Sequence, residues 1–158
     1  MILKFVDDNR AVSLSVGFIM TFGITAITMI VVVSSFYGMM DGAEQTTMRN
    51  EFEIHGNDIA LQISNIDTTV QLTENLGGKI ESICYSPPLP DEIAGQQYSV
   101  EFSNQTREII FESHGKDATR VKIPYSTTVT DVASVKLYSG SSEFRMHYDP
   151  TSRLIKME

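Results

Sequence analysis

An uncharged run constrains this chain of 158 residues more than any other feature of its sequence. The run extends from Ala11 to Met40 and contains no Asp, Glu, Lys or Arg. A bilayer core of ~30 Å is spanned by about 20 apolar residues of α-helix, so the run is long enough to cross a membrane. We therefore expect a membrane-spanning helix over about residues 14–40.

The segment in front of this run differs from an ordinary secretory signal. The first ten residues, MILKFVDDNR, carry Asp7 and Asp8 beside Lys4 and Arg10. An ordinary signal has a basic n-region, an apolar region of about 7–15 residues and a small-residue cleavage site. The uncharged run is about twice that long, and no A-x-A-like site follows it. We therefore expect the hydrophobic run to remain in the mature protein.

Helical periodicity continues beyond the uncharged run into a polar segment. The chain contains no Pro from Asp41 to Asp67, and its apolar residues there recur at helical spacing: Met48, Phe52, Ile59, Ile63 and Ile66. Gly42 and Gly56 each weaken a helix by up to ~1 kcal/mol relative to Ala, which would allow gentle bends. We expect one long helix over residues 12–67, hydrophobic on all sides in its first half and amphipathic in its second.

Small residues recur every four positions within the apolar part. They are Ser13, Gly17, Thr21 and Thr25, which share one face of a helix. Small faces let helix backbones approach closely in lipid, so this row is a candidate helix-packing surface. The alternative is that the Ser and Thr hydroxyls bond to carbonyl groups of their own helix.

The rest of the chain, residues 68–158, has the pattern of short β-strands. Eight segments favour strands: TTVQLTENL, KIESICYS, QQYSVEFS, REIIFES, TRVKIPY, ASVKLYS, EFRMHY and RLIKM. The last two are joined by the turn sequence Asp149-Pro150-Thr151-Ser152. We expect a small antiparallel β domain, either a sandwich or a meander, and hence an α+β chain.

Alternation within these segments predicts which side chains face the core. Tyr98, Val100 and Phe102 should share one face of their strand. Phe144, Met146 and Tyr148 should share a face of theirs, with His147 pointing away. Cys84, which is the chain's single cysteine, is expected to be a small buried hydrophobe in a strand.

Composition and motifs argue against nucleic-acid binding and against catalysis. The net charge is −8, and no cluster of Lys and Arg offers phosphate contacts. His55, His114 and His147 lack the spacing of a metal site, and no nucleophile or phosphate-binding motif occurs. We therefore expect no enzyme activity, no cofactor and no metal. Asn104-Gln105-Thr106 is an N-glycosylation sequon in a predicted turn.

The order of these segments resembles one known family. The leader ending in NRA, the run VSLSVGFIMTFGITAITMIVVV, the amphipathic continuation and the β domain together resemble archaeal type IV pilin-like proteins. The resemblance implies a class III signal peptide over residues 1–11, which a membrane-embedded prepilin peptidase cuts. Arg10 matches the basic position and Ala11 the small one, so the resemblance places the cut between Ala11 and Val12.

The same resemblance implies a function. Such a chain is a structural subunit that is inserted in the cell membrane, with its C-terminal domain outside the cytoplasm. It then assembles through its N-terminal helix into a filament or pseudopilus. Its partners would be the membrane, the peptidase, other copies or other pilin-like subunits, and the assembly machinery. Val16 lies where bacterial pilins carry a glutamate, so that charge pairing is absent here.

Two other functional classes stay open at this point. The first is a single-pass membrane protein whose β domain binds a ligand or partner without polymerising. The second is a membrane-anchored enzyme, for which the sequence contains no recognisable site. Helical periodicity beyond Met40 favours the pilin-like subunit, because an ordinary membrane anchor does not need it.

Overall fold

A computed structural model describes the backbone of residues 9–115, 118–140 and 144–158, and the side chains of the first helix from Ser15 onward. The chain divides into two compact units between Ala43 and Glu44. We call residues up to 43 the N-terminal unit and residues 44–158 the C-terminal unit.

The described residues contain one helix, α1 (Asn9–Asn75), which contributes residues to both units. The sequence predicted a helix over residues 12–67 followed by a strand over TTVQLTENL. The prediction of a strand there is wrong, because residues 68–75 continue α1. Val70 extends the row of buried helix residues that includes Ile66. Gly77 ends the helix in a left-handed conformation, with φ 72°. The Gly77 N–H donates to Glu74 O, and the Gly78 N–H donates to Thr73 O. These two hydrogen bonds form a Schellman motif.

In the part of the chain that the structure describes, eight strands follow the helix and form two four-stranded sheets. One sheet has the order β4-β3-β2-β6 and the other the order β1-β7-β8-β5. The strands of the first sheet are β2 (Tyr98–Ser103), β3 (Glu108–Ser113), β4 (Arg120–Pro124) and β6 (Val135–Tyr138). Those of the second are β1 (Ile83–Tyr85), β5 (Asp131–Val132), β7 (Met146–Asp149) and β8 (Leu154–Met157).

Strand pairing confirms the predicted α+β class with a small, mainly antiparallel β region. All pairs are antiparallel except β5 with β8, a parallel pair that the sequence did not predict. The predicted turn joins β7 to β8, where Asp149 is aligned with Leu154. Tyr98, Val100 and Phe102 are all buried, as the alternation in β2 predicted.

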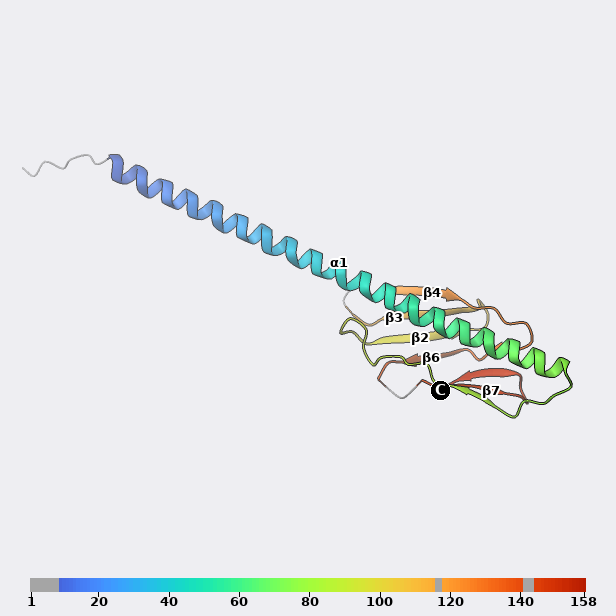
Figure 1. Ribbon diagram of the computed structural model, residues 1–158. Helices are drawn as coiled ribbons and strands as arrows, with labels where there is room; N and C mark the ends of the chain where they lie inside the picture. Colours follow the sequence, from blue (N-terminus) through green and yellow to red (C-terminus); the bar gives the residue numbers. More distant parts are fainter. Residues whose placement is uncertain (1–8, 116–117, 141–143) are drawn as a thin grey trace, which may run out of the picture. The chain divides into compact units, whose positions relative to one another are not determined.

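The core of the C-terminal unit lies between α1 and the sheets. Figure 1 shows α1 running along β4, β3 and β2 in this unit. Phe52 of α1 packs against Tyr98 and Phe111, with ring centroids 5.6 Å and 5.2 Å away. The buried hydrophobic side chains of α1 are Met48, Phe52, Ile59, Ile63, Ile66 and Val70. The amphipathic half of the helix is therefore the central element of this core.

Gly56 has a packing role that its helix propensity alone does not suggest. It is buried in α1 where the helix passes over Ile123 of β4 and Phe111 of β3. A Cβ atom at this position would overlap Ile123 Cδ1 and lie 2.7 Å from Ile123 Cγ1. The Ile123 side chain therefore packs directly on the helix backbone at Gly56, and a larger residue there requires Ile123 or α1 to shift.

Cys84 is exposed, contrary to the prediction that it is buried. It is the middle residue of the edge strand β1, and its neighbours Ile83 and Tyr85 pack against the core. Alternate residues of a strand point to opposite faces, so packing Ile83 and Tyr85 inward turns Cys84 outward. On β7, Met146 and Tyr148 are buried and His147 is half-buried, as the alternation there predicted.

Candidate functional site

The strongest functional feature is the apolar surface of α1 between Ser15 and Met40. One described helix is long and apolar enough to cross a membrane, and none of its most apolar window is buried. The exposed fractions of its large hydrophobic side chains range from 43% at Val33 to 73% at Phe18 and Met39. A helix that is apolar on all sides is stable only where lipid or other protein covers it. The segment therefore indicates membrane anchoring.

The row of small residues lies on this segment. The hydroxyl of Thr21 donates to Gly17 O and that of Thr25 donates to Thr21 O, each at 2.8 Å. The alternative considered from the sequence, bonding within the same helix, therefore occurs at both threonines. These bonds satisfy the hydroxyl donors of Thr21 and Thr25, so the two threonines present small side chains without unpaired donors. This surface suits both lipid and a close helix neighbour, and its packing role stays a prediction.

The remaining residues of the predicted cleavage and packing sites lie outside the described side chains. They are Arg10, Ala11, Val12 and Ser13, for which only a helical backbone is described. Cleavage between Ala11 and Val12 therefore also stays a prediction.

In the C-terminal unit, Asp67 binds α1 to the loop between β4 and β5. Its carboxylate accepts the backbone N–H groups of Thr128, Val129 and Thr130 at 2.8–3.0 Å, and the Thr130 hydroxyl at 2.8 Å. The residue is only 5% exposed. Burial alone would raise the pKa of this carboxyl, but the hydrogen bonds more than offset burial, so the pKa lies below its usual value.

The sequence analysis assigned no role to Asp67. Its partners lie about 60 residues further along the chain, and no local pattern connects them. A weak signal exists, because Asp67 directly follows the buried Ile66 and so interrupts the edge of an apolar helix face. Such an acidic residue requires hydrogen-bond donors once the face is covered.

Other polar contacts connect α1 to the β-rich part, among them the ion pair of Glu74 with Arg153, whose nearest atoms are 3.1 Å apart. The Tyr85 hydroxyl donates to Asp58 at 3.1 Å, and the Gln96 amide donates to Glu44. Within the β-rich part, the hydroxyl of Tyr98 on β2 donates to Pro90 O in the preceding loop at 2.6 Å. Burial raises the pKa of Tyr98 to about 12, so this hydroxyl stays protonated and remains a donor.

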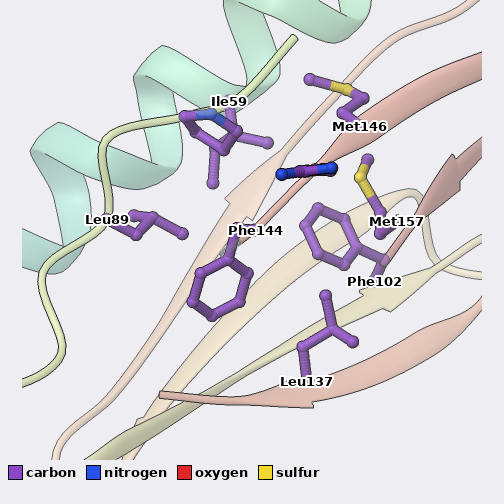
Figure 2. A pocket seen from close by; sticks show the side chains of 9 residues that line it. Ile59, Leu89, Phe102, Leu137, Phe144, Met146 and Met157 are labelled. Atoms are coloured by element: carbon purple, nitrogen blue, oxygen red, sulfur yellow. The ribbon is translucent and has the colours of Figure 1, made fainter. Parts of the chain in front are cut away.

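The C-terminal unit contains an apolar gap and an open hollow. Figure 2 shows Ile59, Phe102, Leu137, Phe144, Met146 and Met157 around the gap, which has space of about 10 Å³ for the centre of a water molecule. That is about the room that one water needs, so the gap is a packing defect and not a ligand site. The hollow, of about 250 Å³, lies at the end of α1 beside Glu74, Lys79 and Tyr148.

Both units fall within one protein family. The family described as "Family of unknown function (DUF7266)" matches residues 7–157. The chain belongs to the DUF7266 family. Among curated proteins and among solved structures, no match was found. Because the DUF7266 match runs through the apolar helix and the β-rich unit, these two parts belong to one family pattern.

The other candidate positions of this DUF7266 chain lie apart from each other. His55 is on α1, His147 is on β7 and His114 follows β3. Among the residues that the structure describes, no group of three or more His, Cys, Asp or Glu side chains could hold a metal ion. Asn104 is half-buried in the turn between β2 and β3, where Gln105 and Thr106 are exposed.

Proposed function

We propose that this chain is a pilin-like structural subunit, which is inserted in the membrane and then assembles through α1 into an extracellular filament or pseudopilus-type complex. The observation that carries this proposal is the exposure of α1 on all sides from Val16 to Met40. Lipid covers such a helix before assembly, and neighbouring copies of the same helix cover it afterwards. The same apolar residues of α1 therefore suit both the membrane-inserted chain and the assembled complex.

The organisation of the C-terminal unit supports the same proposal. The amphipathic half of α1 is the core of this unit and is held there by Phe52 and Asp67. An ordinary anchor needs only a membrane span, whereas a subunit that assembles through its helix requires the helix to be built into its outer domain. On this proposal the C-terminal unit lies outside the cytoplasm, and a prepilin-type peptidase and an assembly machinery act on the chain.

The row of small residues should face a neighbouring helix. We expect Gly17→Leu to weaken association by about 1–2 kcal/mol per contact, or roughly tenfold, because leucine keeps the backbones apart without reducing hydrophobicity. Disulfide cross-linking in membranes through Thr21→Cys, in a full chain that also carries Cys84→Ser, measures the effect. Gly23→Leu is the matched control, because Gly23 lies on the other side of the helix and its substitution should leave cross-linking unchanged.

The outcomes of this experiment separate the functional classes. A disulfide-linked dimer through Thr21→Cys, which is the largest product that one cysteine per chain can form, supports a subunit that associates through α1. If Thr21→Cys forms no product at native expression level, the chain is a solitary membrane-anchored domain and the proposal fails. If Gly17→Leu and Gly23→Leu behave alike, assembly does not use the row of small residues.

Processing of the leader is a separate consequence. We expect the membrane-bound mature chain to begin at Val12, and Ala11→Leu to block the cut, because the peptidase requires a small residue there. N-terminal sequencing and mass measurement show where the mature chain begins and whether Ala11→Leu remains uncut. Val16→Leu is the control, and it should be processed normally. A mature chain beginning near Glu44 would show cleavage after the hydrophobic run and contradict the pilin-like proposal.

Glycosylation at Asn104 follows if the C-terminal unit is exported. The exposed turn makes the Asn104-Gln105-Thr106 sequon accessible to a glycosyltransferase. We expect native protein to be heavier than the bare mature chain, and Asn104→Gln and Thr106→Val to remove the same mass increment. Intact mass measurement of protein from its natural host tests this, and a bare mass in the unsubstituted protein would refute it.

A further inference from the structure

The open hollow at the C-terminal end of α1 has room for a small molecule. Its volume is about 250 Å³, against about 10 Å³ for the apolar gap in the same unit. A single water needs roughly 10–15 Å³ of such space, so the hollow is not a packing defect. The end of α1, the segment after it and the turn from β7 to β8 all contribute to its lining, which includes Val70, Glu74, Lys79, Ile80, Tyr148 and Pro150.

The hydroxyl of Tyr148 is an unpaired polar group at this hollow. The residue is only 2% exposed, and its hydroxyl makes no hydrogen bond within the part of the chain that the structure describes. By contrast, Tyr85, Tyr98 and Tyr125 each donate to a protein oxygen at 2.6–3.1 Å. A buried hydroxyl without a partner is unfavourable, so such groups are rare. Because Tyr148 lines the hollow, a molecule in the hollow is the partner that its hydroxyl lacks.

The Tyr148 hydroxyl is available as a donor at neutral pH. Burial raises the pKa of this phenol above its usual value, and the nearby Glu74 carboxylate raises it further. The hydroxyl therefore keeps its proton. Glu74 also lines the hollow, so the two side chains offer a donor and an acceptor to the same ligand.

Charge at the hollow is positive, although the whole chain has a net charge of −8. The Glu74 carboxylate is already paired with the Arg153 guanidinium, at 3.1 Å and 3.3 Å from one nitrogen to its two oxygens. Lys79 is exposed and has no acidic partner among the described residues. The end of α1 contributes only about half a negative charge, which the ammonium of Lys79 exceeds. A carboxylate on the ligand would pair with this ammonium.

The rest of the lining suits a small molecule with both carbon and hydroxyl groups. Val70, Ile80 and Pro150 present aliphatic carbon to the hollow, against which the CH groups of a small ring can pack. Each oxygen of Glu74 accepts one bond from Arg153 and retains a lone pair, so it can also accept from a ligand hydroxyl.

We propose that the hollow binds a small hydroxylated carboxylate, with the size and chemistry of a single acidic sugar. Lys79 pairs with the carboxylate of the ligand, Tyr148 donates to one of its oxygens, and Glu74 accepts from one of its hydroxyl groups. Ile80 and Pro150 pack against its ring. This binding goes beyond the proposed structural role and does not depend on it, because no residue of the hollow belongs to the row of small residues.

Ligand-observed NMR on the full chain in detergent tests the proposal, with glucuronate and galacturonate as probes. We expect at least one of them to bind saturably and at least tenfold more tightly than glucose, which has the ring and hydroxyl groups but no carboxylate. Lys79→Gln should weaken this binding at least tenfold, because it removes a charged hydrogen bond. Lys122→Gln is the matched control, because Lys122 is an exposed lysine on β4 that pairs with Glu108, and its loss should leave binding unchanged.

Three outcomes of this experiment would overturn the proposal. The first is that neither acidic sugar binds saturably. The second is that glucose binds as tightly as the acidic sugars, so that the carboxylate is not recognised. The third is that acetate binds as tightly as they do, in which case the hollow recognises a carboxylate alone.

Tyr148→Phe gives a readout that a purely structural role would not produce. It removes only the hydroxyl, which has no partner in the described chain, so the midpoint of chemical unfolding without ligand should not fall. Binding of the acidic sugar should weaken by up to about tenfold. Tyr85→Phe should do the reverse, lowering the midpoint and leaving binding unchanged, because the Tyr85 hydroxyl donates to Asp58. A lowered midpoint with unchanged binding in Tyr148→Phe would refute its role in the site.

Discussion

Replacing Asp67 with alanine is expected to lower the free energy of unfolding of the C-terminal unit by about 3–5 kcal/mol. The carboxylate accepts four hydrogen bonds from the loop at Thr128–Thr130, three of them from backbone N–H groups. Alanine leaves these donors without an acceptor, and each buried donor left unpaired costs about 1–3 kcal/mol. The loop would detach from α1, so β5, which follows it directly, would also be weakened.

Chemical unfolding of the full chain in detergent measures this loss. The chain contains no Trp, so near-ultraviolet circular dichroism of tyrosines such as Tyr98 and Tyr125 reports the packing of the C-terminal unit. Asp131→Ala is the matched control, because Asp131 is an exposed carboxylate close to the same loop, and its loss should cost less than about 0.5 kcal/mol. A loss below 1 kcal/mol for Asp67→Ala would show that solvent replaces the carboxylate at little cost.

Acid provides an independent readout of the same contact. The pKa of Asp67 is lowered in the folded chain, so its contribution to stability is complete above the unfolded value of about 3.8. That contribution is lost as the pH falls from there through the folded pKa, where the carboxyl gains a proton. Asp67→Asn should therefore lose less stability than the unsubstituted chain over this acid range. If the free energy of unfolding falls equally with pH in Asp67→Asn and in the unsubstituted chain, the pKa of Asp67 is not lowered by folding.

Gly56→Ala is expected to destabilise the C-terminal unit by about 1–3 kcal/mol, although alanine is the better helix former. The added methyl group would overlap Ile123 Cδ1 and lie 3.3 Å from Phe111 Cε2, so the Ile123 side chain must move or α1 must shift away from β4. Gain of helix propensity offsets at most ~1 kcal/mol of this cost. The same unfolding experiment measures the difference.

Gly42→Ala is the control of opposite sign. A Cβ atom at Gly42 meets nothing within 4 Å, so alanine there brings only the better helix propensity. We expect Gly42→Ala to be neutral or to stabilise the chain by up to ~1 kcal/mol. If Gly56→Ala and Gly42→Ala both stabilise the chain against unfolding, the close approach at Gly56 does not constrain packing.

The parts of this fold that were predictable depend on local patterns. The apolar run, the helical spacing of Met48 to Ile66 and the alternation in β2 each reflect which side of an element is covered, and this is visible within a few residues. The turn at Asp149–Ser152 has its own residue preferences. The candidate membrane helix was predictable for the same reason, because hydrophobic length alone meets the requirement of a bilayer.

An alternating segment such as TTVQLTENL is compatible with either a strand or a helix, and there local pattern is insufficient. Tertiary contact decides in favour of the helix, because Val70 packs in the core in register with Ile66 and Gly77 then stops α1. The exposure of Cys84 has a similar origin. The short strand β1 must turn Ile83 and Tyr85 inward, and its sequence does not say which alternate set faces the core.

The sequence by itself therefore determined the long helix, its apolar and amphipathic halves and the β-rich character of the remainder. Tertiary structure alone decided the parallel pairing of β5 with β8, the need for glycine at position 56 and the role of Asp67. Each of these three depends on residues far away in the chain. Asp67 meets its donors more than 60 residues later, and only the folded chain brings a buried carboxylate and those N–H groups to hydrogen-bonding distance.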